Sequence, residues 1–303
     1  MNTQTPENLD SDLNEADYDD MSKCLISVGI PLYKSKPFLE NIRENCKVLM
    51  LREDIEIIIS DQHCMDDSIV LLEQEWGDDQ RFIFLKSTKA ISWIAHMNLL
   101  LSKASGEYFR WMPHDDVFPK GCLEPLIKRL DSDRQVILAY GPTRGIDLNG
   151  NRLPDRDRIN TSPVKPFERW RFQYSLDFFS NCYCDGAFKG LFRRKPIVDA
   201  GLFIAKTYQV VGAERAWLFG VSLLGGFGEE PDSIYLKRYH AQSTHAQWKI
   251  SNRHRLSITA SMAGYLWTYC YSSRKSIFGI IYLWRKTLKQ MIMAYWSKLK
   301  KKV

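Results

Sequence analysis

Apolar and polar residues along the chain form blocks that fit strands and helices in turn. Short β-branched runs stop abruptly at a proline or an acid, and amphipathic segments of helical length separate them. The runs that predict strands cover residues 25–30, 55–60, 81–85, 108–112, 136–140 and 234–237. The segments that predict helices cover residues 36–51, 67–76, 91–102, 121–130 and 213–224, and the chain from about 248 onward. This order predicts an α/β fold with a mixed, mainly parallel sheet flanked by helices.

Acidic residues directly follow two of these predicted strands. Asp61 comes after the run 55–60, and Asp115 and Asp116 come after the run 108–112. Ligands of parallel α/β sheets bind beyond the carboxyl ends of the strands, where these three side chains would meet. Carboxylates grouped there suit a divalent metal and a phosphorylated ligand. The sequence therefore predicts an enzyme that acts on a nucleotide-type substrate.

Charge divides the chain into three parts. Residues 1–21 hold seven acids and no base, which predicts a disordered acidic tail. Residues 22–247 hold the predicted sheet, and residues 248–303 form a helical basic extension. The last acid is Asp232, and fourteen Lys and Arg follow it. A basic region of this kind needs an anionic partner, and because the rest of the chain is acidic we expect no nucleic acid.

The basic extension contains an amphipathic pattern. Over residues 276–299 apolar side chains recur at helical spacing between lysines and arginines, as in a helix that lies on an anionic membrane surface. The alternative is a helix packed on the domain with a solvated basic edge. No segment predicts a transmembrane span or a signal peptide, and seven cysteines without a C-x-x-C pair fit reduced thiols. We expect a cytoplasmic protein, peripheral on the cytosolic membrane face.

An ordered series of motifs resembles glycosyltransferase family 2 over roughly residues 24–245. The motifs are Val28–Tyr33, Glu56–Asp61 with Asp66–Ser68, Gly106–Tyr108 with His114–Asp116, Gly190–Arg194, Ala200–Phe203, Ala213–Arg215 and Lys237–His240. The resemblance implies the GT-A fold, a Rossmann-like sheet that binds nucleotide-diphospho-sugars. It also implies an inverting, metal-dependent transferase that moves a sugar from a UDP-linked donor to a glycan or lipid-linked acceptor.

The same resemblance implies a metal site for Mn²⁺ or Mg²⁺ after the fourth strand. The family has a D-x-D-like motif there, and Pro113 replaces its first Asp in this chain. Asp115 and Asp116 are then the expected metal ligands, Asp115 also contacts the donor, and His240 is the expected third ligand. The alternative for Asp115 and Asp116 is that they cap the following helix, and the alternative for His240 is an ordinary surface or core histidine.

The remaining roles implied by the resemblance concern the donor and the acceptor. The expected donor contacts are Pro31, Tyr33, Asp61, Asn98 and Arg238. For the base-recognition acid Asp61 and for Asn98, ordinary loop and helix positions are the alternatives. Aromatic residues in the stretch 167–183 suit stacking on a sugar.

Glu214 is the expected general base. The family commonly has an acidic pair at this point, whereas this chain has Glu214 followed by Arg215. Together with Pro113, this departure keeps open a non-catalytic relative that binds nucleotide or glycan. A sugar-phosphate nucleotidylyltransferase is less well supported, because residues 31–37 contain no glycine for a phosphate loop.

Overall fold

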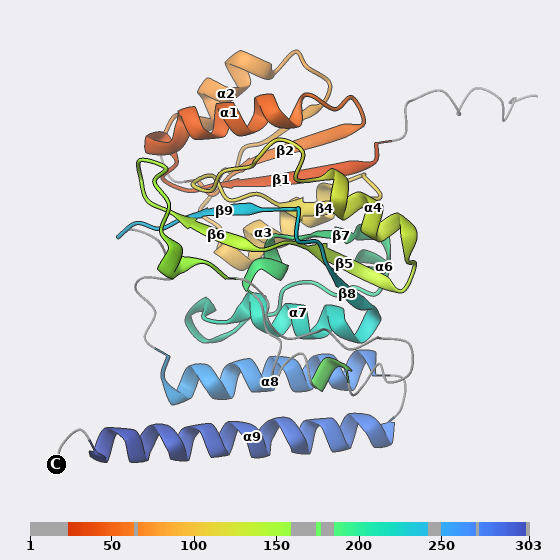
Figure 1. The fold of residues 1–303 in the computed structure, drawn as a ribbon, viewed down its shortest axis with the longest axis vertical. Helices are drawn as coiled ribbons and strands as arrows, with labels where there is room; N and C mark the ends of the chain where they lie inside the picture. The colour runs from red at the N-terminus through yellow and green to blue at the C-terminus, as the bar shows by residue number, and fades with distance from the viewer. Residues whose placement is uncertain are drawn as a thin grey trace, which may run out of the picture.

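The computed structural model describes residues 24–63, 66–158, 174–176, 185–241, 250–270 and 273–300. The predicted acidic tail 1–21 lies outside these ranges, and so does the aromatic-rich stretch 167–183 apart from residues 174–176. Strands and helices alternate through the first part of the chain, and helices follow residue 250 (Figure 1).

The first half of the chain forms a parallel sheet, as predicted. In spatial order its strands are β3 (Phe82–Leu85), β2 (Ile55–Asp61), β1 (Ile26–Leu32) and β4 (Tyr108–Trp111). The helices between them are α1 (Leu39–Leu49), α2 (Ser68–Trp76) and α3 (Trp93–Lys103). Strands β1 and β2 are buried along nearly their whole length, because helices cover both faces of a parallel sheet.

The rest of the sheet is mixed. Strand β7 (Leu191–Arg193) lies antiparallel between β4 and β5 (Val136–Tyr140), and β8 (Gly226–Glu229) runs parallel to β5. A separate parallel pair joins β6 (Thr143–Ile146) to β9 (Tyr235–Arg238). The other helices here are α4 (Glu124–Ser132), α6 (Arg194–Asp199) and α7 (Ala213–Leu224), with 3-10 turns at Lys36–Phe38, Pro154–Arg156, Asp185–Lys189 and Tyr208–Val210. The predicted α/β class with a mainly parallel sheet is confirmed.

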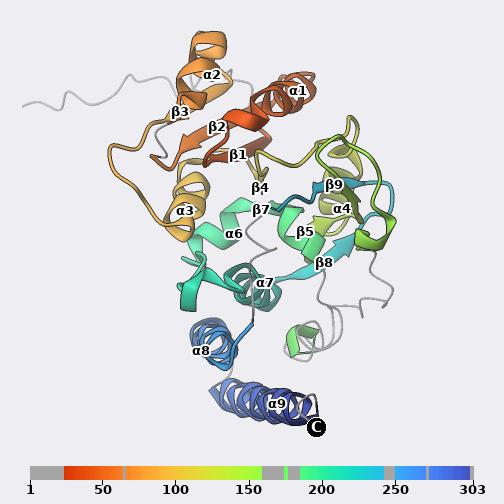
Figure 2. The same cartoon turned by 90° about the vertical axis from the view of Figure 1, so that its left-hand side faces the viewer.

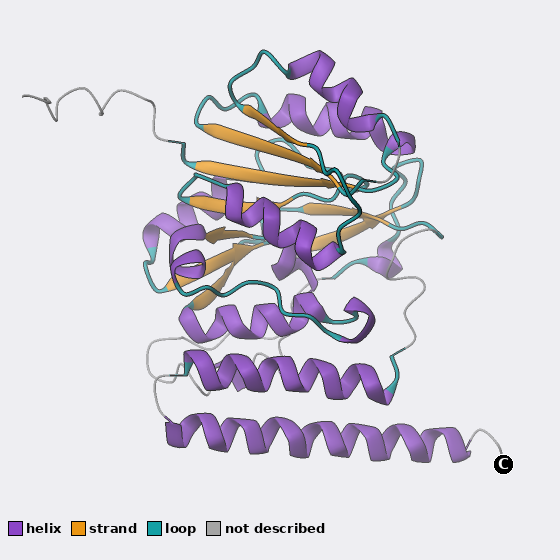
Figure 3. Cartoon of the chain, turned by 180° about the vertical axis from the view of Figure 1, so that it is seen from behind, coloured by secondary structure: helices purple, strands orange, loops and turns teal. Residues whose placement is uncertain are grey.

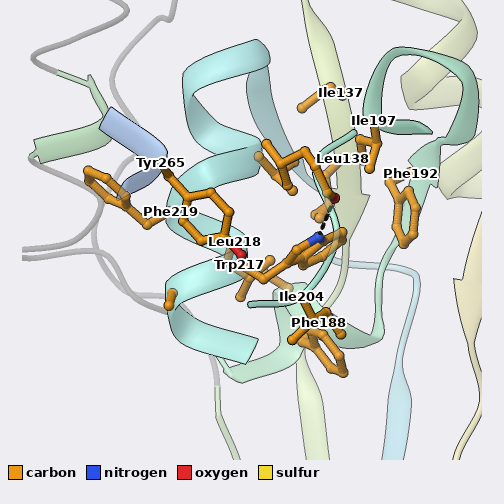
Figure 4. Packing of buried hydrophobic residues seen from close by; sticks show 14 of the residues in the cluster. Ile137, Leu138, Phe188, Phe192, Ile197, Ile204, Trp217, Leu218, Phe219 and Tyr265 are labelled. Atoms are coloured by element: carbon orange, nitrogen blue, oxygen red, sulfur yellow. Dashed lines mark hydrogen bonds between the residues drawn. The ribbon is translucent and has the colours of Figure 1, made fainter. Parts of the chain in front are cut away.

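Hydrophobic cores fill both sides of the sheet. One core lies under α1, α2 and α4, and the other lies under α3, α6 and α7. At the centre of the second, the Trp217 indole Nε1 donates to the Leu202 carbonyl at 3.0 Å, and the ring meets Phe188 and Phe192 edge to face (Figure 4). Tyr265 from the C-terminal part of the chain belongs to the same core.

Two long helices extend the molecule beyond α7. They are α8 (Asn252–Tyr269) and α9 (Ser273–Lys300), which stack as successive layers with α9 farthest from the sheet (Figures 1 and 2). The same stack is seen from behind in Figure 3. Small polar groups join the two helices: the Ser276 Oγ donates to the Leu266 carbonyl at 3.0 Å, and the hydroxyls of Thr259 and Thr287 lie 2.6 Å apart.

Helix α9 turns much of its apolar surface to solvent. Leu283 is fully buried against the rest of the molecule, whereas the side chains exposed on the outside are Ile277, Phe278, Ile281, Trp284, Leu288, Ile292, Met293, Tyr295 and Trp296. Exposed bases accompany them at Arg274, Lys275, Arg285 and Lys289. Among the described helices, α9 included, none combines the length and the apolar character that crossing a bilayer requires.

Candidate active site

The carboxyl ends of β1, β2 and β4 meet at one edge of the sheet. Leu32 at the end of β1 pairs with Asp61 at the end of β2. The loop after β4 folds over the end of β1, where the His114 Nδ1 lies 3.2 Å from the Pro31 carbonyl oxygen. The strand-end side chains that the sequence predicted to meet are thus brought to one edge.

Pro31, Tyr33 and Asp61 occupy the part of this edge expected to hold the nucleoside. The Asp61 carboxylate is nearly buried, and its Oδ2 accepts a hydrogen bond from the backbone N–H of His63 at 2.9 Å. The Tyr33 ring is 49% exposed, and its backbone N–H donates to the Ser35 Oγ at 2.8 Å. This part of the edge therefore offers an exposed aromatic ring beside a carboxylate held by its own turn.

Asp115 in the loop after β4 and His240 after β9 form a polar pair. The His240 Nε2 donates to the Asp115 Oδ2 at 3.0 Å, and the Asp115 side chain keeps 20% of its surface exposed. Burial by itself would raise the pKa of Asp115, but the neighbouring His114 and the bond from His240 outweigh it and hold that pKa below its ordinary value. The Phe38 ring lies between the two imidazoles, with ring centres 5.4 Å from His114 and 5.3 Å from His240.

Asp116 points the other way, into the protein. Its side chain accepts a hydrogen bond from the Tyr235 hydroxyl at Oδ2 and one from the Arg238 backbone N–H at Oδ1, at 2.8 Å, and the residue is 3% exposed. Burial raises the pKa of Asp116, and the adjacent Asp115 carboxylate raises it further. Both oxygens of Asp116 are thus already used by protein donors.

The three predicted metal ligands are consequently not brought into one cluster. Within the residues that the structure describes, no group of three or more His, Cys, Asp or Glu side chains is arranged to hold a metal ion. Of the three, Asp115 and His240 have side chains in contact, at 3.0 Å. Carboxylate oxygen and imidazole nitrogen are donor types that Mn²⁺ accepts, and phosphate oxygens can complete such a site.

Arg238 and Asn98 are tied into the protein framework. The Arg238 guanidinium donates to the backbone carbonyls of Asp115, Asp147 and Leu148 at 2.8–2.9 Å and to the Asn41 Oδ1 at 3.1 Å. The Asn98 amide donates to the Ile204 carbonyl at 3.0 Å and accepts from the Ile204 N–H at 2.9 Å. The polar atoms of both side chains therefore fix neighbouring loops, and their predicted donor contacts stay predictions.

Glu214 lies in the first turn of α7, where the helix dipole favours an acid. The turn before it contains Gln209 and Val210 with φ of 50° and 66°, a conformation that is strained for a β-branched residue. Helix α8 anchors this turn: the His254 Nε2 donates to the Gln209 Oε1 at 3.0 Å, and the Tyr208 backbone N–H donates to the Ser257 Oγ at 2.8 Å. The C-terminal helices thus help to set the position of the expected base.

Lys189, which the sequence analysis did not identify, lies among the acids of the site. Its Nζ is 4.0 Å from the Asp116 Oδ2, and its side chain is 17% exposed. Burial lowers the pKa of Lys189, whereas the charges of Asp116, Asp115 and Glu214 act in the opposite direction. The charges of two acids after β4 and of one acid in the first turn of α7 thus act on the same cation. The sequence signal for this edge is an acidic residue directly after a predicted strand, and a lysine outside such a position does not give that signal.

Comparison with known proteins agrees with this architecture. The sequence model described as Glycosyl transferase family 2 matches residues 27–197, more than half of the chain. An uncharacterised glycosyltransferase of Methanocaldococcus jannaschii is 25% identical over 161 residues, which make up 53% of this chain and 52% of that protein. One of Rickettsia conorii is 26% identical over 133 residues, 43% of this chain and 21% of that protein. The chain thus spans about half or less of the length of these relatives.

Two solved structures share the fold at low sequence identity. TarS 1–349 of S. aureus in complex with UDP-GlcNAc has a TM-score of 0.59 at 13% identity, covering 83% of this chain and 69% of that one. The mannosyltransferase PcManGT of Pyrobaculum calidifontis, in complex with GDP-Man and Mn²⁺, has a TM-score of 0.51 at 13% identity, covering 88% and 83%. Since the family match spans the parallel strands and the loop with both adjacent acids, and these neighbours share the surrounding fold, the chain belongs to glycosyltransferase family 2 and has a GT-A-like α/β architecture.

Proposed function

We propose that this protein transfers a sugar, with inversion, from a UDP-sugar to a hydroxyl group of a glycan or lipid-linked acceptor. The observation that carries the proposal is the strand edge that holds Asp61 and the Asp115–His240 pair, with the Lys189 Nζ 4.0 Å from the neighbouring Asp116 and with Glu214 among the charges that act on this lysine. Such an edge provides separate places for a base, a diphosphate and a reacting hydroxyl.

The nucleoside end of the donor fits the surface at Pro31, Tyr33 and Asp61. A carboxylate accepts the N–H of a uracil ring, and an exposed tyrosine ring offers a stacking surface. The binding of UDP and UDP-GlcNAc by TarS supports a uridine donor in this fold. In this proposal Asn98 and Arg238 act on the donor indirectly, by holding the loops around it.

Asp115 and His240 are the residues that would hold a divalent cation. When bound, Mn²⁺ or Mg²⁺ supplies Lewis-acid stabilisation of the charge on the departing diphosphate. The complex of PcManGT with GDP-Man and Mn²⁺ supports the binding of a divalent metal together with a nucleotide-sugar in this fold. Asp116 would position its neighbour Asp115 through the bonds to Tyr235 and to the Arg238 backbone.

Glu214 is the proposed general base. As the acceptor oxygen forms its bond to C1 of the sugar, its proton passes to the Glu214 carboxylate, and the electron pair of the breaking C1–O bond stays on the diphosphate. A positioned base of this kind contributes about 10²–10⁴-fold to the rate. Because the next residue is Arg215 and not a second acid, Glu214 is the carboxylate of this pair of positions that can accept the proton.

Titration calorimetry with UDP tests the donor site, with and without Mn²⁺. Metal-dependent binding that Asp115→Ala abolishes, and that the distant Asp199→Ala leaves intact, is the expected result. Release of UDP from UDP-sugars then separates an enzyme from a non-catalytic relative. Glu214→Gln should bind UDP like the wild type while its turnover falls at least a hundredfold; absence of any donor turnover in the wild type would favour the non-catalytic relative.

The outward face of α9 supports contact with an anionic membrane on the cytosolic side. Exposed apolar side chains recur along a helix of 28 residues, with exposed lysines and arginines among them. A partner must cover apolar side chains and neutralise bases at once, which a bilayer with anionic lipids does. A lipid-linked acceptor would be presented by the same surface.

Flotation with vesicles tests this surface in the full chain. The wild type should float with phosphatidylglycerol vesicles, less so in high salt, and not with phosphatidylcholine alone. Ile281→Glu/Leu288→Glu should reduce flotation at least tenfold, whereas Leu51→Glu, at an equally exposed leucine elsewhere, should not. Equal flotation of the two variants would refute membrane contact. So would light scattering that shows a dimer of the wild type and a monomer of Ile281→Glu/Leu288→Glu.

A further inference from the structure

Lys189 occupies a position that its protein surroundings do not fully explain. Among the described residues, the ion-pair partner of its ammonium group is the Asp116 Oδ2 at 4.0 Å, too far for a hydrogen bond, and the Phe188 ring centre lies 5.7 Å from the same Nζ. That same oxygen already accepts from the Tyr235 hydroxyl, and the other one accepts from the Arg238 backbone. The side chain is only 17% exposed, and an ammonium group with three N–H donors that is mostly withdrawn from water is stabilised when further acceptors reach it.

The backbone that carries this side chain is fixed. The Lys189 carbonyl accepts a bond of 2.6 Å from the Arg110 Nη2, and the Arg110 guanidinium lies 4.6 Å from the centre of the Phe118 ring and is itself 2% exposed. At the next residue, Gly190, a Cβ would come within 2.4 Å of the Ala139 carbonyl oxygen. The chain therefore enters β7 in one tightly packed path, and the Lys189 side chain leaves it toward the site.

The electrostatic neighbours of Lys189 define the space that it faces. Asp115 and Asp116 lie on the loop after β4, Glu214 lies in the first turn of α7, and Lys237 adds a second cation from β9. In the proposed reaction the diphosphate of the donor occupies the space between the Asp115–His240 pair and the base. An anionic ligand there would meet the ammonium group of Lys189.

We propose that Lys189 binds the diphosphate of the donor and stabilises the UDP leaving group. This inference rests on the proposed function, and it adds a cation supplied by the protein itself. Its N–H groups donate to the oxygens of the phosphate next to the sugar, and the negative charge that accumulates there as the C1–O bond breaks is stabilised by the fixed ammonium. A lysine that serves only as a counter-ion for Asp116 would not strengthen the binding of UDP relative to that of uridine.

Titration calorimetry with three ligands distinguishes these roles. We compare UDP, UMP and uridine on the wild type, Lys189→Met, Lys189→Arg and the control Lys120→Met, which removes an exposed lysine from the loop after β4. Lys189→Met should weaken UDP binding about tenfold to a hundredfold, in line with the loss of a charged hydrogen bond, and should leave uridine binding unchanged. Lys189→Arg should restore part of the UDP affinity, and Lys120→Met should match the wild type.

The outcomes separate failure of this inference from failure of the proposed function. If the wild type binds UDP and Lys189→Met binds UDP equally well, or loses UDP and uridine to the same degree, Lys189 has no role at the diphosphate. If the wild type binds no UDP at all, the proposed function itself fails. A melting temperature of Lys189→Met close to that of the wild type shows that the comparison concerns folded protein.

Discussion

The adjacent acids Asp115 and Asp116 should respond to mutation in opposite ways. Asp116 is 3% exposed and accepts bonds from the Tyr235 hydroxyl and the Arg238 backbone N–H, whereas Asp115 has one side-chain bond, from His240, and remains partly exposed. We therefore expect Asp116→Ala to destabilise the fold and Asp115→Ala to remove metal-dependent UDP binding with little effect on stability.

The size of the difference follows from the bonds lost. Each hydrogen bond to a charged group contributes about 1.5–3 kcal/mol, and removing one partner of a buried polar pair leaves the other without an acceptor. Asp116→Ala should thus lower the free energy of unfolding by about 3–5 kcal/mol, and Asp115→Ala by about 1 kcal/mol. Asp116→Asn should cost about 1–2 kcal/mol, because the amide oxygen still accepts from the Arg238 backbone.

Urea unfolding at pH 7, followed by tryptophan fluorescence, measures these differences. With an m-value of about 3 kcal/mol/M, Asp116→Ala should lower the midpoint by about 1–1.7 M and Asp115→Ala by about 0.3 M. Equal shifts for the two alanine variants would refute the assignment of Asp116 to the framework. Loss of UDP binding by Asp116→Asn with unchanged stability would do so as well.

Three further predictions concern the framework around the site. Burial lowers the pKa of His96, whose Nε2 donates to the Ser60 carbonyl at 3.0 Å. The unfolded chain therefore binds the proton at a higher pH than the folded protein does, and the free energy of unfolding should fall as pH drops below about 6.5. A series of urea unfolding curves from pH 7.5 to 5.5 should show a smaller fall for His96→Gln than for the wild type. Gly141→Ala would place a Cβ 1.8 Å from the Ser233 carbonyl oxygen and should lower the free energy of unfolding by more than about 3 kcal/mol. Gly150→Ala, at a φ of 85° with open space around the Cβ, should lower it by about 1–2 kcal/mol. Similar melting temperatures of the two variants would contradict the packing argument. Asn98→Ala removes both bonds to the Ile204 backbone and should cost about 1–3 kcal/mol in urea unfolding, an expectation that a midpoint unchanged from the wild type would exclude.

The mainly apolar runs located the parallel half of the sheet, because each of its strands is rich in β-branched or aromatic residues and has a helix after it. The strands that the sequence did not predict, β6, β7 and β8, have only three or four residues, and β6 and β8 contain glycine. Such short strands form because they pair with neighbouring strands that are already in place, and the local β-propensity of their residues does not predict them.

The candidate site was predictable in its members on strand ends and less so in their roles. Asp61 is the last residue of the buried strand β2, and Asp115 lies in the loop after the buried strand β4, so strand ends fix the places of both. The contrast between Asp115 and Asp116 depends on Tyr235 and Arg238, which lie on a strand more than a hundred residues later. Lys189 was not identified because its burial comes from tertiary packing around a 3-10 turn, which has no periodic signal.

The bonds of Arg238 have a consequence for the order in which the molecule folds. This side chain reaches Asn41, 197 positions earlier, and its backbone N–H reaches Asp116, 122 positions earlier. The four parallel strands have all been synthesised before β9 leaves the ribosome, so Asp116 meets its partners last, and these distant contacts close slowly. A nascent chain that stops short of β9 would hold a nearly complete parallel sheet whose active edge has not yet been assembled.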